Sequence, residues 1–408
     1  MREAKKRPAI EVADIIKKYG DKYRATGKVP AHHLRTLSAI ERCRTAELGG
    51  HLNVYTDCGV TRISYNSCRN RHCPKCGGLA RELWIEDRRR ELLPVRYQHI
   101  VFTIPAELNH FCRYDPTFCY GLLFRAAWKT LDTFARDKNW LGARAAASMV
   151  LHTWGQNLSL HPHVHAIVPT GGLDGDGNWI SPKKGLRKSG FLFPVDAMSG
   201  VFRGIYLKEF MTAWTDGQLN LPPDAPTKKK EVDRWRNARY RQAWLIYAKA
   251  PFGGPESVIE YLGRYTHKTA ISNHRLLDLN GGKVTFRYKD YRDGNKQKSM
   301  ALAGVEFLRR FCLHILPPRF RRIRHYGILS NYHKTSALAA ARASLDVDPA
   351  SVPEKKPRAE RVRQLIEDFL GRGINDCPDC GAVDSVRQIP LPPSPRPPPG
   401  ISAGVVGN

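Results

Sequence analysis

Three histidines stand at alternating positions in the stretch LSLHPHVHAIVPTGG, residues 158–172. In a β-strand, residues two apart point to the same face, so the imidazoles of His161, His163 and His165 would project from one side. Imidazole nitrogens that converge in this way can bind a divalent metal ion. We therefore predict half of a metal site at His163 and His165, with Gln156 swinging across from the preceding turn to supply an oxygen ligand.

Two tyrosines offer a second kind of chemistry. Tyr261 and Tyr265 lie in a segment with helical periodicity, residues 253–270, and residues four apart share one face of a helix. Core packing accounts for this spacing by itself. Beside a metal site, however, a tyrosine hydroxyl can attack a phosphodiester and form a phosphotyrosine link. On this hypothesis Arg264 and Lys268 contact phosphate oxygens, and a solvated helix face is the alternative for both.

Five of the ten cysteines fall within residues 43–78, which predicts a small module held together by metal. Cys73 and Cys76 form a CxxC pair, and Cys58 precedes them at about the separation of the ligand pairs in a zinc ribbon. Tyr55 stands where a second CxxC would begin. The fourth ligand must then come from one of four other residues: Cys68, His72, His51 or Cys43. We expect a zinc site formed by Cys58, Cys68, Cys73 and Cys76; reduced, buried cysteines without metal are the alternative.

Basic residues surround this predicted module. Arg69 and Arg71 lie between two of its cysteines, and we expect them to contact DNA phosphates; a purely structural zinc module is the alternative. A second CxxC motif, CPDC at residues 377–380, has no cysteine or histidine after it. On sequence grounds it is half a site, and we interpret it as vestigial.

The overall charge identifies the class of partner. The 408 residues include 66 Lys and Arg but only 38 Asp and Glu, which gives a net charge of +28. Such an excess is typical of proteins that bind a polyanion, so DNA is the expected partner and an anionic membrane surface the alternative. No transmembrane run and no signal-peptide core is visible. We therefore expect a cytoplasmic protein whose cysteines are thiols or metal ligands.

Hydrophobic periodicity predicts the elements that position these residues. Residues 1–42 form a helical segment, and residues 43–94 form the zinc-binding module with a linker helix. Further on, we expect strands at 97–105 and within 143–169, separated by a helix at 116–137, and helices at 194–219 and 228–249. Residues 346–408 are polar and rich in proline, and we expect a disordered tail.

Two basic stretches are candidate DNA tracks. KKKEVDRWRNARYRQ begins at residue 228, and RFRRIRHY ends at residue 326. Trp235, Tyr240 and Tyr326 within them would offer stacking surfaces for unpaired bases. A solvated surface is the usual interpretation of a charged run, but the net charge of the whole chain favours contact with nucleic acid.

The order of strand, helix, strand, histidine strand and tyrosine helix resembles that of the HUH endonucleases. Within them the chain is similar to the two-tyrosine transposases of bacterial rolling-circle insertion sequences. Three stretches carry the match: YNSCRNRHCPKCGG, LHTWGQNLSLHPHVHAIVPTGG and YLGRYTHKTAISNHRLL. The resemblance covers about residues 35–335. It implies an α+β fold with a zinc-ribbon-like module, followed over residues 95–345 by an HUH domain whose central antiparallel sheet is flanked by helices.

The resemblance also implies a reaction. One strand of single-stranded DNA is cut, leaving a 5′-phosphotyrosine and a free 3′ hydroxyl, with Mg²⁺ or Mn²⁺ as cofactor beside a structural Zn²⁺. Carried over to this chain, His163 and His165 are metal ligands with Gln156 as the third, and Tyr261 and Tyr265 are the nucleophiles. His161 then either supports the metal ligands from behind or helps to hold the phosphate. The expected partners are single-stranded element ends and target DNA, with association with the nucleoid when DNA is bound and a homodimer as one assembly that this allows.

Three other functions compete with this one. A replication initiator or plasmid relaxase of the HUH class shares the chemistry, but the cysteine module argues against it. A zinc-dependent DNA-binding regulator without catalysis would use the histidines structurally. A metallohydrolase of small phosphoesters fits the histidines but not the charge.

Overall fold

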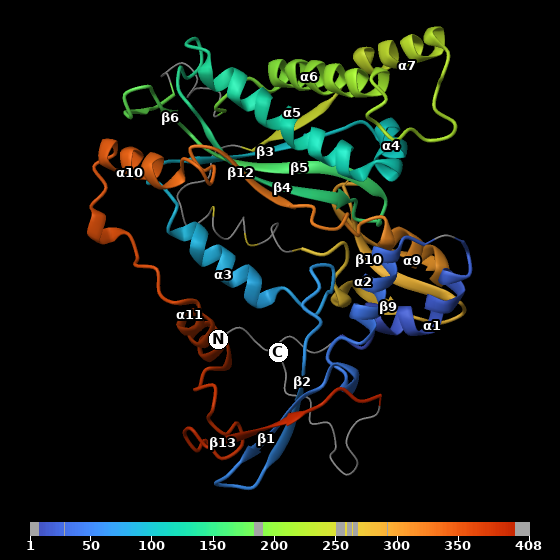
Figure 1. The fold of residues 1–408 in the computed structure, drawn as a ribbon, viewed down its shortest axis with the longest axis vertical. Helices are drawn as coiled ribbons and strands as arrows, with labels where there is room; N and C mark the ends of the chain where they lie inside the picture. Colours follow the sequence, from blue (N-terminus) through green and yellow to red (C-terminus); the bar gives the residue numbers. More distant parts are fainter. Residues whose placement is uncertain are drawn as a thin grey trace. The chain divides into compact units, whose positions relative to one another are not determined.

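The computed structural model describes residues 8–27, 29–182, 191–249, 258, 263, 268–291 and 293–395 (Figure 1). The chain forms two compact units. Unit 1 comprises residues 1–84, 267–315 and 354–408, and unit 2 comprises residues 85–266 and 316–353. Each unit therefore combines segments that are far apart in sequence, and the segment boundaries expected at residues 42, 94 and 345 do not coincide with this division.

Unit 2 is built on a five-stranded sheet with strand order β12-β4-β5-β3-β8. Each neighbouring pair of strands is antiparallel, as the resemblance to HUH endonucleases implies. The five strands are β3 (Tyr97–Thr103), β4 (Ala146–Trp154), β5 (Leu160–Pro169), β8 (Leu245–Ala248) and β12 (Ile323–Gly327). Side chains of β4 are buried along almost its whole length, as expected for a strand with covered faces on both sides.

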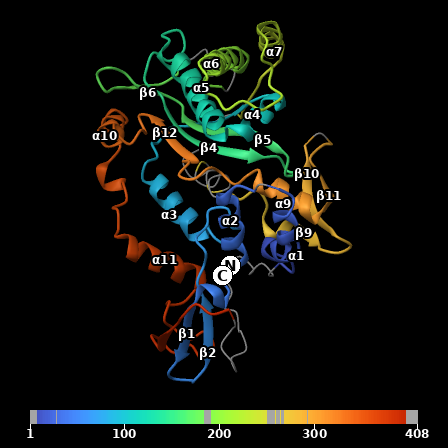
Figure 2. The ribbon, with the colours of Figure 1, turned by 45° about the vertical axis from the view of Figure 1, so that its right-hand side comes forward.

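Helices cover one face of this sheet (Figures 1 and 2). α5 (Pro116–Arg136) and α6 (Val195–Thr215) pack against each other there. Phe102 of β3 is fully buried, and its ring centroid lies 5.2 Å from that of Phe202 in α6. Val164 of β5 pairs with Phe102 and so shares this face. Because neighbours along a strand alternate, His163 and His165 point to the opposite face, away from α5 and α6.

The remaining elements of unit 2 are short or lie at the edges. They are η2 (Ala106–Leu108), α4 (Asn109–Tyr114), β6 (Gly172–Leu173), β7 (Trp179–Ile180), α7 (Lys229–Arg241), α10 (Lys334–Ser344) and η5 (Pro349–Ser351). The helix expected over 228–249 ends at Arg241. Leu245–Ala248 instead joins the sheet as β8, because Leu245 and Tyr247 are exposed while Ile246 is buried, which is the alternation of a strand.

Unit 1 contains two three-stranded antiparallel sheets, β13-β1-β2 and β11-β10-β9. The strands are β1 (Gly50–Tyr55), β2 (Thr61–Tyr65), β9 (Leu276–Asp278), β10 (Lys283–Asp290), β11 (Lys296–Ala303) and β13 (Val386–Leu391). The helices are α1 (Val12–Arg24), α2 (Ala31–Glu41), η1 (Ala46–Leu48), η4 (Asn273–Arg275), α9 (Gly304–Cys312) and α11 (Arg358–Leu370). α3 (Gly78–Arg89) begins in unit 1 and ends in unit 2.

The C-terminal region differs from the expected disordered tail. α11 and β13 both lie within it, and β13 forms a full ladder with β1 from Gly50–Leu391 to Tyr55–Val386. Backbone pairing to a distant strand supplies order that composition does not reveal. Residues 396–408, with half of the prolines of the LPPSPRPPPG stretch, lie outside the described residues. None of the helices among the described residues has the length and apolar character needed to cross a bilayer.

The core of unit 1 depends on close packing between its first helix and α9. α1 buries one apolar face, including Val12 and Tyr19, and the Val12 amide donates a hydrogen bond to Asn273 Oδ1 at 3.1 Å. Gly304, the first residue of α9, lies directly against the ring of Tyr19. A side chain at that position has no room, so this glycine sets how closely the two helices approach.

We predict that Gly304→Ala destabilises unit 1. The added methyl group would overlap the Tyr19 ring, and overpacking of this kind typically costs about 1–3 kcal/mol. The measurement is the midpoint of chemical unfolding together with amide exchange in α1. Gly200→Ala in α6 is the control, because no atom would contact its methyl group and the change should be neutral or stabilising. Equal midpoints for the two variants would contradict the prediction.

Candidate functional site

Three histidines from two neighbouring strands meet on the sheet face that α5 and α6 leave uncovered. His152 of β4 lies directly opposite His163 of β5 in the ladder, and directly opposed residues share a face. One ring nitrogen from each of His152, His163 and His165 lies within 4.8 Å of the others. His152 and His165 are buried, and His163 is partly exposed. This cluster contains both histidines of the predicted half site.

The nitrogen positions fit a single metal ion. His163 Nδ1 donates to the carbonyl oxygen of His161 at 2.7 Å, which leaves the Nε2 lone pair of His163 available as a ligand. His165 Nε2 lies 3.1 Å from His152 Nδ1. Two ligands at about 2.1 Å from one ion, in adjacent octahedral positions, lie about 3.0 Å apart. The donor set and its spacing therefore suit a divalent cation.

A fourth histidine, His99 of β3, orients one of these ligands. Its Nε2 lies 2.9 Å from His165 Nδ1. A metal ion bound to His165 Nε2 would leave the hydrogen on His165 Nδ1, which would then donate it to His99. Burial, followed by the charge of Lys249, lowers the pKa of His99 to about 3, so His99 is a neutral acceptor. Partners of this kind fix the ring orientation and tautomer of a metal-binding histidine.

Burial also keeps His163 in its ligand form. Burial, followed by the charge of His161, lowers the pKa of His163 to about 4. Only the neutral imidazole has a lone pair for a metal. His163 is therefore ready to bind an ion at neutral pH without first losing a proton.

The third histidine was not identified by sequence reasoning. Gln156, which the sequence suggests as third ligand, lies in the turn between β4 and β5, whereas His152 lies beside the pair. The sequence feature that could have pointed to His152 is its position near the end of a strand that leads into a short turn. Sequence does not fix the register across that turn, however, and a slip of one residue would have moved His152 to the other face.

Tyr261, Tyr265 and Arg264 lie outside the described residues. Gly263, midway between the tyrosines in sequence, is described. A Cβ built on it would lie 2.7 Å from Cδ1 of Ile85 in α3. Because Gly263 contacts α3, the face of the sheet that α3 covers is also the face on which Gly263 lies.

The last turn of α3 lies against the histidine-bearing face. Arg88 Nη1 is 2.8 Å from Nε2 of His325 in β12. His325 pairs with Ser148, which pairs with Ile167, two residues from His165 and on the same face. Ile85 is one turn from Arg88 on α3. Gly263 accordingly contacts a helix that covers the histidine side of the sheet.

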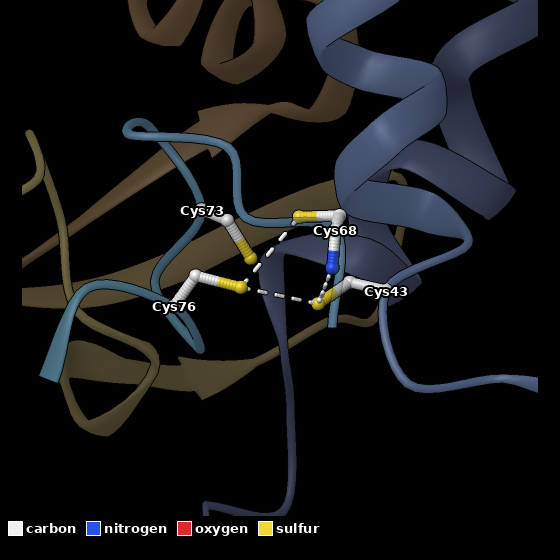
Figure 3. A group of neighbouring side chains, drawn as sticks. All are labelled: Cys43, Cys68, Cys73 and Cys76. Carbon is white, nitrogen blue, oxygen red and sulfur yellow. Dashed lines mark hydrogen bonds between the residues drawn. The ribbon is translucent and has the colours of Figure 1, made fainter. Parts of the chain in front are cut away.

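In unit 1, a second cluster consists of four cysteines: Cys43, Cys68, Cys73 and Cys76 (Figure 3). Their sulfur atoms all lie within 4.8 Å of one another, and the Cys43–Cys76 and Cys68–Cys76 pairs are 3.5 and 3.6 Å apart. Four thiolates around a tetrahedral zinc, at 2.3 Å from it, lie about 3.8 Å apart. The cluster has the composition and nearly the dimensions of a structural zinc site.

Cys58 is not part of this cluster, in contrast to the sequence prediction, and Cys43 takes its place. The reason is the β1–β2 hairpin. Cys43 and Cys68 flank the base of the hairpin, whereas Cys58 lies in the turn at its tip, about 17 Å away along the strands. Cysteine spacing alone does not reveal that a hairpin separates the ligands. His51 and His72, the other candidates, are not members of the cluster.

Backbone amides favour the thiolate form of these cysteines. The Cys68 amide donates to Cys43 Sγ at 3.4 Å, and the Asn70 amide donates to Cys68 Sγ at 3.5 Å. Hydrogen bonds among the four sulfurs lower the pKa of Cys43 to about 7 and lower that of Cys76, while they raise the pKa values of Cys68 and Cys73. Thiolate is the form that binds zinc.

The predicted DNA-contacting residues differ in their surroundings. Arg69 and Arg71, in the loop of the cysteine cluster, are exposed, and so is Lys268, which belongs to unit 1. Trp235, expected as a stacking surface, packs its ring against Phe210 at 5.7 Å. It therefore contributes to a packed aromatic cluster, and its role as a stacking surface for bases stays a prediction.

The basic stretch that ends at Tyr326 lines a pocket of about 700 Å³ in unit 2. Four arginines contribute to it: Arg125, Arg319, Arg321 and Arg324. The guanidinium of Arg324 lies 4.4 Å from the ring centroid of Phe124 in α5. Tyr326 stacks on Trp128 at 5.2 Å. The pocket lies along the edge strand β12, on the sheet face toward α5, and arginines of this density suit phosphate groups.

Comparison with known proteins now adds to this geometry. Residues 147–336 match the family model described as "Putative transposase", and residues 15–104 match "Transposase zinc-binding domain". The putative transposase y4qJ of Sinorhizobium fredii is 45% identical over 378 residues, covering 92% of this chain and 94% of that protein. The chain belongs to the two-tyrosine transposases of the IS91 type. The predicted family and the predicted zinc-binding domain are thereby confirmed.

Other similarities are more distant. The transposase for insertion sequence element IS801, from Pseudomonas savastanoi pv. phaseolicola, is 32% identical over 310 residues, covering 73% of this chain and 70% of that protein. A solved structure of TrwC complexed with a 27-mer DNA is 14% identical and covers 43% of this chain and 68% of that chain, with a TM-score of 0.23. A TM-score this low carries no argument about the fold.

The family models fall on the two clusters. The transposase model includes β4, β5 and β12, and therefore the three histidines. The zinc-binding model includes all four cysteines of the Figure 3 cluster. As a member of a transposase family, the chain acts on DNA, in agreement with its charge.

We predict that Cys43→Ser removes one zinc ion per chain and loosens the loop that carries Arg69 and Arg71. Structural zinc contributes an apparent binding free energy of about 10–16 kcal/mol in small modules, and three thiolates hold the ion less firmly than four. Metal content by mass spectrometry and proteolysis of residues 66–77 provide the measurements. Cys112→Ala, at a buried thiol of α4, is the control, and the prediction is contradicted if both variants retain the same zinc content.

We also predict that His152→Ala weakens Mn²⁺ binding at least about tenfold, because it removes one of three nitrogen ligands. Gln156→Ala, five residues from it in sequence, should change the affinity much less. Both values can be measured by electron paramagnetic resonance titration of the zinc-loaded chain. A larger loss in the Gln156 variant would assign the third ligand to the turn instead of to β4.

Proposed function

We propose that this transposase cuts one strand of single-stranded DNA and rejoins it through a covalent tyrosine intermediate. The Oη of Tyr261 or Tyr265 attacks the scissile phosphorus and loses its proton to the surroundings. The phosphorus–O3′ bond breaks and O3′ takes up a proton from the solvent, so the 5′ phosphate becomes linked to tyrosine and a free 3′ hydroxyl leaves. The phosphodiester energy is retained in the new bond, which allows a 3′ hydroxyl to reverse the step and join another strand.

The observation that carries this proposal is the convergence of His152, His163 and His165 on one face of the sheet, opposite α5 and α6. These residues would hold a divalent ion that polarises the phosphate and offsets its developing charge. Three nitrogen ligands suit Mn²⁺ better than Mg²⁺, because Mg²⁺ prefers oxygen. His99 would hold the ring of His165 in the ligand orientation, and His161, next to the cluster on the same strand, would contact the phosphate.

The position of Gly263 supports the pairing of tyrosines with this site. It lies two residues from each tyrosine and contacts α3, whose last turn covers the histidine face. A residue of an extended or helical chain lies within about 7 Å of one two positions away. A nucleophile near the histidine cluster is therefore compatible with the described part of the chain.

Other basic residues would position the DNA. The arginine pocket along β12 offers a phosphate-binding position, and Arg69 and Arg71 offer another on unit 1. Phosphate contacts of this kind fix register without reading sequence. Arg264 and Lys268 as phosphate contacts, assembly into a homodimer and association with the nucleoid stay predictions.

The test is a covalent adduct between the zinc-loaded protein and single-stranded DNA from the ends of its own element, in the presence of Mn²⁺. We expect a denaturation-resistant adduct that retains a label at the 3′ end of the DNA, because the 5′ phosphate of the downstream fragment is bound. A label at the 5′ end should be released with the 3′ hydroxyl. The adduct should disappear when Tyr261→Phe and Tyr265→Phe are combined, and in His163→Ala.

Tyr247→Phe is the matched control. Tyr247 of β8 is 50% exposed, and it pairs with Val101, which pairs with His165. Tyr247 is thus an accessible tyrosine on the histidine-bearing face. If Tyr261 and Tyr265 are the nucleophiles, Tyr247→Phe should leave the adduct yield unchanged. An adduct that depends on Tyr247 would reassign the nucleophile, and the absence of any adduct, with DNA binding retained, would favour a regulator without catalysis.

A further inference from the structure

Two turns in unit 1 have the same backbone construction. In the turn after β1, the Tyr55 amide donates to the Val60 carbonyl at 2.9 Å, and the Gly59 amide donates to the Tyr55 carbonyl at 2.8 Å. The corresponding bonds in the second turn run from Cys377 to Ala382 at 2.8 Å and from Gly381 to Cys377 at 3.1 Å. Both glycines have positive φ, +72° and +78°, which closes each turn in the same way.

Cysteines occupy three of the four equivalent positions in these turns. Cys377 and Cys380 take the first and fourth positions of the second turn, and Cys58 takes the fourth position of the first. Tyr55, a buried side chain, takes the remaining position. The sequence of the second turn, CPDCG, repeats the CPKCG of residues 73–77, which belongs to the four-cysteine cluster.

The two turns bring the three thiols together although Cys58 and Cys377 are 319 residues apart in the chain. The three sulfur atoms lie within 4.8 Å of one another, and those of Cys58 and Cys377 are 3.5 Å apart. All three are free thiols. The Asp379 amide donates to Cys377 Sγ at 3.4 Å, as amides do toward the thiolates of a metal knuckle. CPDC is thus not a vestigial half site, because the tip of the first hairpin completes it.

Interactions around the thiols hold the two turns in place. Arg62 of β2 pairs with Asp379 at 2.6 Å, and the Thr56 amide donates to the Ser385 carbonyl at 2.9 Å. The sheet itself contributes little apolar burial, since no residue of β13 is buried. A three-stranded sheet with so small a core needs another source of stability.

We propose that Cys58, Cys377 and Cys380 bind a second metal ion, Zn²⁺ by the preference of thiolates, which fastens the C-terminal strand to the N-terminal hairpin. The fourth coordination position falls to a water molecule. Two observations carry this. Tyr55 stands where a fourth thiol would be, and Cys58 and Cys380 are exposed to solvent. Within the described part of the chain, no carboxylate or imidazole joins the three sulfurs.

Three thiolates and an open position distinguish this ion from that of the four-cysteine cluster. The second ion should exchange with free metal faster, and a chelator should remove it first. The reason is that a chelator can displace the water molecule at its open position. Its loss should free residues 372–391 while the Figure 3 cluster retains its ion. The C-terminal strand is then a detachable part of unit 1, controlled by metal supply.

The test is the zinc content of the full-length protein by native mass spectrometry, with amide exchange in β13 as a second readout. With the three-histidine site removed by His163→Ala, we expect two zinc ions in the parent chain and one when Cys380→Ser is added, with faster exchange over residues 386–391 in the variant. Asp379→Asn is the matched control, because it breaks the ion pair to Arg62 but leaves the three sulfurs, and it should retain two ions. The reverse variant Tyr55→Cys should slow removal of the second ion by a chelator.

Three outcomes would overturn the proposal. One is a parent chain, purified under reducing conditions with zinc present, that binds a single ion. Another is a Cys380 variant that keeps both ions. A third is a disulfide between Cys58 and Cys377, found by peptide mapping of protein freshly isolated from cells, since a disulfide would remove the two ligands. Metal content reports on this site without reference to DNA cleavage, so the result is independent of the proposed nuclease function.

Discussion

The hydrogen-bond register between β4 and β5 is the constraint on which the histidine centre depends. It sets His152 opposite His163, and because side chains alternate, a slip by one residue would send His152 into the layer beneath the helices. Burial along nearly the whole of β4 opposes such a slip, since moving its apolar residues to the other face would expose some and crowd others. The metal site is thus positioned by the packing of strands whose other face has no part in the chemistry.

Unit 1 relies on a different source of order. Cysteine clusters lie at both ends of the β1–β2 hairpin, with four thiols at its base and three at its tip. Sulfur ligands take the place of apolar side chains where short segments cannot bury enough surface. The chain assembles this unit from three separated segments, and the basic loop with Arg69 and Arg71 belongs to it. Rigidity at the base of the hairpin therefore determines how these arginines are presented.

Sequence reasoning succeeded where local pattern decides the structure. Alternation placed His163 and His165 on one face, and helical periodicity located α5 and α6 to within a few residues. It failed where a distant partner decides: no local signal places His99 behind His165, puts Cys43 rather than Cys58 beside Cys76, or joins β13 to β1. The basic helix, which we expected to continue past Arg241, ends there because Ile246 is buried where β8 pairs with β3. The sequence of the segment alone does not show that β3 offers this pairing.

The joining of the last strand to the first hairpin has a consequence during synthesis. Cys58 leaves the ribosome 319 residues before Cys377, an interval of about 16–64 s at 5–20 residues per second. Throughout that time one side of β1 has unpaired amides and carbonyls, the arrangement that invites association with foreign strands. β13 therefore pairs with β1 only after residues 386–391 have left the ribosome, and a nascent chain that stalls before them keeps an unpaired strand edge.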